Sequence, residues 1–237
     1  MGTITTGITG LDNMVYSGIP DGSIISIIGP AGSGKTIFSL QFLYANLLQG
    51  KKCIYISVAH TMEELVNNSL KFGWDLSPYI ENQKLIVKTF ELSSMTYSVS
   101  GVSPISRYLD ELPGFIYSQT ADLIILDSIT EYLMLHNTNI EHRNKVLNLF
   151  QIIKSKRSSA LITAELDVES EKSTFGIVEF VADGVISLRR VQSKDMSELI
   201  HIIQIAKMRW TKHSREIRQY DITDAGIEVY SKYQIML

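Results

Sequence analysis

Short runs of apolar residues alternate along this chain with segments in which apolar residues recur every three or four positions. The first run is Ser23–Ile28, and the helical spacing that follows it covers Thr36–Leu48. Uninterrupted apolar runs are typical of strands buried on both faces of a parallel sheet, and the wider spacing indicates helices that cover it. By the same criteria we predict further strands at Cys53–Val58, Lys84–Thr89, Leu123–Leu126 and Ala160–Ala164, and further helices at Thr61–Phe72, Ser103–Tyr117 and Glu141–Lys156.

The pattern changes after about Asp183, where apolar segments follow one another with short links. We predict strands here at Val185–Leu188, Leu199–Lys207, Glu216–Ile222 and Gly226–Tyr230. Consecutive strands with short links favour an antiparallel meander. Because strands and helices alternate in the preceding part, the predicted fold class is α/β, with a mostly parallel central sheet flanked by helices and extended by C-terminal antiparallel strands.

Two of the predicted helices carry local signals. Thr61, followed three residues later by Glu64, fits a capping box at the start of a helix. Pro113 and Gly114 are a candidate break in the helix Ser103–Tyr117, because proline removes a backbone donor and glycine lowers helix propensity.

The composition is that of a globular chain, with 45% apolar and 20% charged residues among 237. No Pro-rich or low-complexity linker divides it, so we expect residues 1–237 to form a single domain. Cys53, the one cysteine, excludes an internal disulfide and fits a buried strand. The net charge of -3 does not indicate nucleic-acid binding by the molecule as a whole. We expect a cytoplasmic protein without a membrane partner, because no apolar run reaches the roughly 18 residues of a membrane span.

The sequence GPAGSGKT at residues 29–36 fits the pattern G-x-x-x-x-G-K-[ST] between a predicted strand and a predicted helix. Its glycines let backbone N–H groups turn toward phosphate oxygens, and the start of the helix adds its positive end. In this interpretation Lys35 binds the β- and γ-phosphates and Thr36 joins the Mg²⁺ shell. The loop predicts bound ATP, with the nucleotide held by Gly29, Pro30, Ala31, Gly32, Ser33, Gly34, Lys35 and Thr36.

Asp127 follows the predicted strand Leu123–Leu126, at the edge where open α/β sheets bind ligands. A carboxylate there can hold Mg²⁺ directly or through water. The alternative is a structural aspartate that caps the following turn.

Blocks along nearly the whole chain resemble the RecA-like ATPases of the KaiC and RadA group, most closely the small archaeal RadA paralogues of the RadC subfamily. The blocks are TTGITGLDNMVYSGIPDGSIISIIGPAGSGKT, KFGWDL, FGIVEFVADGVISL, KMRWTKH and DITDAGIEVY. The resemblance implies a RecA-like core. The full recombinases of this group have an N-terminal helical DNA-binding domain, and the resemblance does not include one. We therefore do not expect a complete strand-exchange enzyme.

The resemblance also assigns roles near the γ-phosphate. It places Lys207 and Arg209 on a late strand that reaches the nucleotide of a neighbouring subunit, which implies a homo-oligomer, either a ring or a filament. The alternative is an exposed strand face. By the same resemblance His213 lines the nucleotide, and Glu165 falls at the position of a polar γ-phosphate sensor, although a loop residue is an equal alternative.

The sequence departs from the family mainly at the position of the catalytic glutamate. Alignment through Thr61 puts Ala59 and His60 where the family has acidic residues. Ala59 cannot take a proton, whereas a neutral His60 imidazole can accept a hydrogen bond from water. We therefore expect an ATPase with slow turnover.

Two functions are compatible with these residues. The first is a RadA paralogue that binds single-stranded DNA, modulates homologous recombination and has a recombinase or other protein as a possible partner. Its DNA would lie on the loops 134–143 and 166–176, but the second loop is mainly acidic, which disfavours phosphate contacts. An alternative basic surface consists of Lys154, Lys156, Arg157, Arg189, Arg190, Lys194, Lys212, Arg215 and Arg218. The second function is a KaiC-like regulatory ATPase whose nucleotide state is read by a protein partner. Residues 178–183 lack the adjacent Ser and Thr of the autophosphorylating KaiC half.

Overall fold

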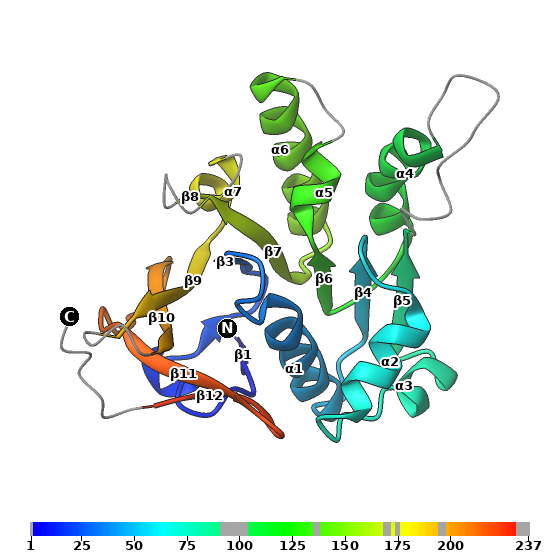
Figure 1. The fold of residues 1–237 in the computed structure, drawn as a ribbon. Coiled ribbons are helices and arrows are strands. Elements are labelled where there is room, and N and C mark those ends of the chain that lie inside the picture. The colour runs from blue at the N-terminus through cyan, green and yellow to red at the C-terminus, as the bar shows by residue number, and fades with distance from the viewer. Residues whose placement is uncertain are drawn as a thin grey trace.

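The fold is built around one large sheet, shown in Figure 1, in a computed structural model that describes residues 2–90, 104–134, 138–167, 172–173, 176–193 and 198–230. Its strands are β3 (Ile24–Gly29), β4 (Cys53–Ser57), β5 (Leu85–Thr89), β6 (Leu123–Asp127), β7 (Ser159–Asp167), β8 (Lys172–Ser173), β9 (Gly184–Gln192), β10 (Leu199–Met208), β11 (Arg218–Thr223) and β12 (Gly226–Val229). They lie in the order β12-β11-β10-β9-β3-β7-β6-β4-β5, and β8 pairs with β7.

Strands β9, β3, β7, β6, β4 and β5 run parallel to one another, and β10, β11 and β12 continue the sheet antiparallel. This confirms the predicted α/β class and the C-terminal antiparallel strands. Strands β9, β10, β11 and β12 form the predicted antiparallel meander, and β9 also pairs in parallel with β3, which joins the meander to the parallel strands. The short helix α7 (Ile177–Val181) precedes β9 and returns the chain to the opposite end of the sheet.

The remaining helices are α1 (Lys35–Leu48), α2 (Met62–Leu70), α3 (Ser77–Glu81), α4 (Pro104–Ser118), α5 (Ile129–Met134) and α6 (Asn139–Ser155). They cover both faces of the sheet, as the alternation along β3 demonstrates. Ile25 and Ile27 join the core cluster that contains residues of α1 and α2. Ile24 and Ile28 join the cluster that contains residues of α4 and α6. Each strand is therefore apolar on both sides, which explains its uninterrupted apolar sequence.

The capping-box signal was confirmed, and the predicted helix Ser103–Tyr117 forms without the candidate break at Pro113 and Gly114. At the start of α2, the Thr61 N–H donates to Glu64 Oε2 at 2.9 Å and the Glu64 N–H donates to Thr61 Oγ1 at 3.2 Å, which completes the predicted capping box. Helix α4, however, continues through Pro113 to Ser118. Burial of Leu112 and Ile116 on the same face stabilises this helix against the sheet, and outweighs the one donor that the proline lacks.

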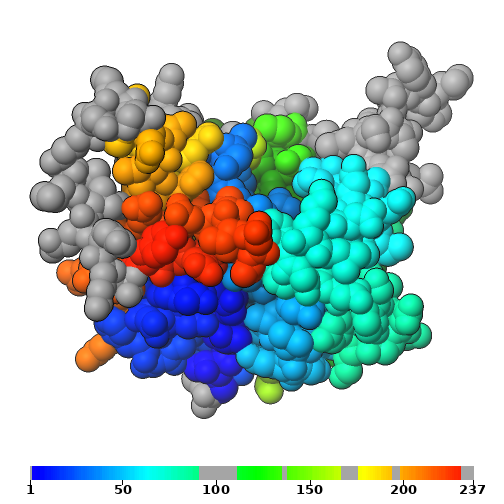
Figure 2. Space-filling model, turned by 60° about the horizontal axis from the view of Figure 1, so that its bottom comes forward, coloured from blue at the N-terminus to red at the C-terminus, as the bar shows by residue number. Residues whose placement is uncertain are grey.

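The N-terminal segment packs under the C-terminal strands. Thr3–Ile4 (β1) and Ile19–Pro20 (β2) form a separate antiparallel pair. The Val229 N–H donates to the Thr9 carbonyl at 2.8 Å, and Figure 2 shows the orange-to-red strands β11 and β12 lying across the dark blue N-terminal residues. This arrangement brings both ends of the described chain onto the face covered by α1.

Two further expectations concern single features. Cys53 is fully buried in β4, and burial raises the pKa of its thiol to about 12, which confirms it as a core residue. Among the helices that the structure describes, none is both long and apolar enough to cross a bilayer.

Candidate functional site

The phosphate-binding loop joins the end of β3 to the start of α1, at the carboxyl edge of the parallel strands (Figure 1). Gly34 precedes α1 with a φ of +82°, which side chains with a Cβ rarely adopt. A Cβ on Gly29 would lie 2.4 Å from Ser33 Oγ and 2.8 Å from the Leu188 carbonyl oxygen. The loop therefore closes tightly only because both positions are glycine.

Lys35 lies inside this loop. Its Nζ donates to the Gly29 carbonyl at 2.8 Å and to the Pro30 carbonyl at 3.0 Å. Burial lowers the pKa of the ammonium, while the carboxylates of Glu165 and Asp127 act in the opposite direction. A phosphate oxygen is a stronger acceptor than a carbonyl, because it is charged. A phosphate in the loop would therefore compete favourably with these carbonyls for the ammonium.

Asp127 ends β6 and is almost fully buried. Its Oδ2 accepts hydrogen bonds from Thr36 Oγ1 at 2.8 Å and from the Tyr55 hydroxyl at 2.9 Å, and its Oδ1 accepts one from Thr163 Oγ1. Burial, and then the charge of Asp127, raise the pKa of Tyr55, so this hydroxyl remains a donor. Thr36 and Asp127 meet as the sequence predicted.

The oxygens of Thr36 and Asp127 fit a magnesium site. Mg²⁺ in nucleotide enzymes is typically held by one or two carboxylates together with substrate phosphates and waters, rather than by a cage of protein ligands. In the described part of the chain no group of three or more His, Cys, Asp or Glu side chains converges. These two residues would hold the ion beside the loop.

Two glutamates, Glu165 and Glu131, oppose the lowering of the Lys35 pKa through their negative charge. Glu165 lies on β7 opposite Gly29 of β3, and its N–H donates to Thr130 Oγ1 at 2.8 Å. Glu131, on α5, accepts a hydrogen bond from Ser128 Oγ and is a residue that the sequence analysis missed. Ser128 and Glu131 have the spacing of a capping box, and this pattern in the sequence could have identified Glu131.

His60 lies between β4 and α2, at the same edge of the sheet. Its N–H donates to Ser57 Oγ at 3.0 Å, and Ser57 is paired with Asp127 across the neighbouring strands. The side-chain Nδ1 is buried and has no hydrogen-bond partner among the residues that the structure describes. Ala59 is exposed. His60 thus offers one unused ring nitrogen near the predicted site.

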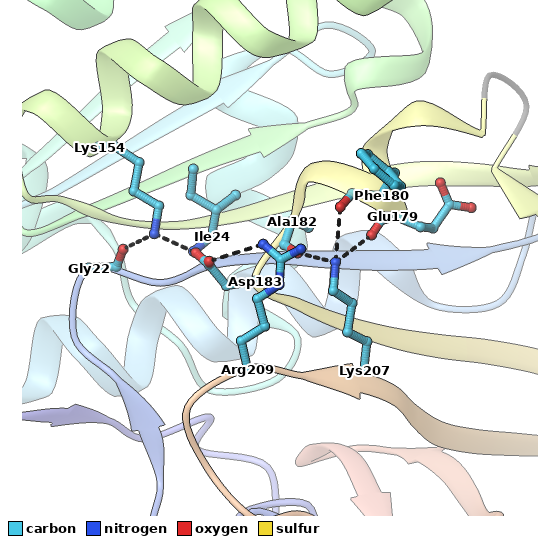
Figure 3. A network of polar contacts seen from close by, with 9 residues as sticks. All are labelled: Gly22, Ile24, Lys154, Glu179, Phe180, Ala182, Asp183, Lys207 and Arg209. Atoms are coloured by element: carbon cyan, nitrogen blue, oxygen red, sulfur yellow. Dashed lines mark hydrogen bonds and ion pairs between the residues drawn. The ribbon is translucent and has the colours of Figure 1, made fainter.

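Lys207 and Arg209 are engaged by their own subunit near the carboxyl end of α7, as Figure 3 shows. Lys207 Nζ donates to the carbonyls of Glu179 at 2.9 Å, Phe180 at 3.1 Å and Ala182 at 2.6 Å. Partial burial, and then the charge of Arg209, lower the pKa of Lys207. Both cations also line an open cavity of about 610 Å³.

Asp183 is the centre of the contacts in Figure 3, and the sequence analysis did not single it out. Its Oδ2 accepts from the Ile24 N–H at 2.9 Å and from Lys154 Nζ. Arg209 Nη1 lies 3.9 Å from the other carboxylate oxygen. One carboxylate therefore joins α6, the start of β3 and the end of β10.

His213 is placed elsewhere. It forms an isolated bridge with Val15, and its Nδ1 lies 2.9 Å from the Ser214 carbonyl oxygen. None of these contacts links it to the phosphate loop of its own subunit. The structure thus brings together the loop, Asp127, Glu165 and the segment of His60, and places Lys207, Arg209 and His213 apart from them.

Two side chains from the late strands contact the loop without having been predicted to do so. Arg190 Nη2 donates to the Ala31 carbonyl at 2.9 Å, and the Tyr220 hydroxyl donates to the Ser33 carbonyl at 2.7 Å. The sequence analysis had assigned Arg190 to a basic surface. Both contacts join residues far apart along the chain, so no local pattern reveals them.

The surfaces considered for DNA are only partly described. Residues 135–137, 168–171, 174–175 and Lys194 lie outside the described residues. His142, within the first loop, is buried on α6. Of the alternative basic surface, Lys154 pairs with Asp183 and Arg218 pairs with Glu216, so these cations already have partners.

Comparisons with known proteins agree with this geometry. The family model described as "ATPase: KaiC" matches residues 4–234. The UPF0273 protein PH0284 of Pyrococcus horikoshii is 30% identical over 96% of this chain and 93% of its own length. The KaiC-like protein PH0186 of the same organism has a solved structure with a TM-score of 0.82 and 26% identity, covering 97% of this chain and 99% of that one.

The circadian clock oscillator protein KaiC of Synechococcus elongatus is 26% identical over 95% of this chain, which spans 43% of that protein. These matches confirm the KaiC part of the resemblance seen in the sequence, and none of them is described as a RadA paralogue. With a phosphate loop, a buried Asp127 and a match along almost all its residues, the chain belongs to the KaiC family of RecA-like ATPases.

Proposed function

We propose that this chain is a regulatory ATPase that binds ATP with Mg²⁺ and presents its nucleotide state to a protein partner. The observation that carries the proposal is the pairing of Thr36 with Asp127, 2.8 Å apart, beside the loop that holds Lys35. The family of the chain supports ATP as the nucleotide. The loop amides and Lys35 bind the phosphates, and the dipole of α1 adds to their attraction.

Thr36 and Asp127 hold Mg²⁺, which when bound neutralises charge on the phosphate oxygens. The hydrogen bonds from Tyr55 and Thr163 fix the orientation of the Asp127 carboxylate. His60 is our candidate for positioning the attacking water, since its Nδ1 is buried without a described partner. Glu165 is the alternative, because it lies opposite the first residue of the loop.

We further propose self-association. Lys207 and Arg209 point toward α7 and Asp183 rather than toward their own phosphate loop. Together with Ile28 they line an open cavity, and a phosphate of a second copy, as a charged acceptor, would compete for Lys207 with the neutral carbonyls that it bonds here. In this arrangement a neighbouring subunit completes the site.

A protein partner is favoured over single-stranded DNA by the charges. The net charge is -3, and Lys154, Arg190 and Arg218 of the basic surface are bound within the subunit. Phosphate contacts require free cations. Binding of single-stranded DNA, which the sequence analysis considered, is therefore the second candidate function, and a titration with an oligonucleotide tests it.

We expect negligible binding of a labelled single-stranded oligonucleotide at low salt, with or without ATP, because the net charge is negative and three cations of the basic surface are bound within the subunit. Fluorescence anisotropy across a salt series measures this. Tight binding whose logarithm falls linearly with the logarithm of salt concentration would restore the DNA-associated function.

For hydrolysis, we expect slow steady-state phosphate release, since loss of a positioned base costs about 10²–10⁴-fold. His60→Ala lowers the rate further, by about 10-fold or more, and Ala59→Glu raises it by restoring an acid. A wild-type rate that His60→Ala leaves unchanged would assign the base to another residue, with Glu165 tested next.

For assembly, we expect light scattering to detect an oligomer in the presence of ATP that Arg209→Ala shifts toward the monomer. Arg209 is about half exposed, and its ion pair with Asp183 is long, at 3.9 Å. Loss of this weak contact leaves the variant subunit folded. Arg215→Ala removes the same charge from an exposed position and serves as the control. A strict monomer with full ATPase activity contradicts the proposal.

A further inference from the structure

We infer that strands β9 and β11 preorganise the phosphate loop, with Arg190 and Tyr220 as its positioning residues. The inference deepens the proposed function and rests on it for the identity of the ligand. Its physical basis is the set of hydrogen bonds that the backbone carbonyls of the loop accept.

When the N–H groups of a loop turn toward phosphates, its carbonyls are not used by the ligand, and hydrogen bonds from side chains can hold them in place. Lys35 supplies the donor for Gly29 and Pro30. Arg190 supplies it for Ala31 and Tyr220 for Ser33. The carbonyls at the first, second, third and fifth positions of the loop are thereby satisfied by side chains.

We expect a bound nucleotide to break the two hydrogen bonds of Lys35 and to leave those of Arg190 and Tyr220 in place. Lys35 must leave Gly29 and Pro30 when it turns to a phosphate, because its ammonium then donates to a stronger acceptor. Arg190 and Tyr220 bond different carbonyls, those of Ala31 and Ser33, so their bonds need not break when Lys35 turns to a phosphate. When the site is filled, they remain the side chains that keep the carbonyls of Ala31 and Ser33 in place.

The sheet explains how both residues reach the loop. Strand β9 pairs in parallel with β3 up to Ile28 opposite Ser187 and then continues to Gln192. Arg190 therefore lies beyond the point where β3 becomes the loop. Its Nη1 would lie 3.5 Å from a Cβ on Gly32.

Tyr220 approaches from β11. It is fully buried, with its ring 5.2 Å from that of His201. Burial raises the pKa of its hydroxyl, and the charge of Arg190 opposes this, so the hydroxyl is neutral and donates. On the same strand, Ile222 Cδ1 would lie 2.9 Å from a Cβ on Gly34. The hairpin thus packs directly on the loop.

The test uses two pairs of variants. Tyr220→Phe removes the hydroxyl that bonds Ser33, and Tyr230→Phe removes one that bonds Asp221 at 2.9 Å instead. Arg190→Ala removes the bond to Ala31, and Arg215→Ala removes the same charge from an exposed position. The dissociation constants of ATP and ADP are measured by calorimetry, and amide hydrogen exchange of residues 29–36 is measured without nucleotide.

We expect Arg190→Ala to weaken both nucleotides by about 10-fold and Tyr220→Phe by about 2- to 10-fold, in line with charged and neutral hydrogen bonds. The loop amides exchange faster in both variants, whereas Arg215→Ala and Tyr230→Phe match the wild type. Faster exchange in the loop distinguishes positioning from a general loss of stability, which would affect the whole sheet.

Unchanged affinities and unchanged loop exchange in Arg190→Ala would overturn the inference. Arg190 is exposed, so this variant folds even if the buried Tyr220→Phe does not. A wild-type protein that binds no nucleotide would refute the proposed function, but exchange in the nucleotide-free protein would still decide whether Arg190 and Tyr220 order the loop.

Discussion

The structure depends on one buried carboxylate. Asp127 is removed from water at the end of β6, and a buried charge is tolerated only if it is fully hydrogen-bonded. Its donors are Thr36 of α1, Tyr55 of β4 and Thr163 of β7. Three elements must therefore assemble around β6, and the same bonds fix the start of α1, and hence the phosphate loop, relative to the sheet. The need to satisfy Asp127 thus positions the site.

A second carboxylate connects the site to the far strands. Asp183 joins the start of β3, through the Ile24 N–H, to Lys154 and Arg209, while Lys207 bonds the last carbonyls of α7. The loop lies at the other end of β3. A partner or second copy that engages Arg209 would therefore act on contacts of the strand that carries the loop.

Local patterns were sufficient to predict the long strands of the main sheet and the position of the loop, because buried parallel strands are apolar throughout and the loop needs glycine at fixed positions, but they missed the two-residue strands β1, β2 and β8. Local patterns failed where contacts between residues far apart in the sequence determine the structure. Burial of Leu112 and Ile116 carries α4 through Pro113, and Arg190 reaches the loop only because β9 runs beside β3. The parallel direction of β9 follows from α7, whose five residues carry too little periodicity to be predicted.

The central claim is that residues 29–36 bind the phosphates of ATP through Lys35. Isothermal calorimetry of ATP with Mg²⁺, on the wild type and on Lys35→Ala, tests it most directly, with circular dichroism to establish that both are folded. We predict that the wild type binds and that Lys35→Ala loses at least about 10-fold in affinity, because its charged hydrogen bonds to phosphate are gone, while the two spectra coincide. Equal affinity in two folded proteins would contradict the account.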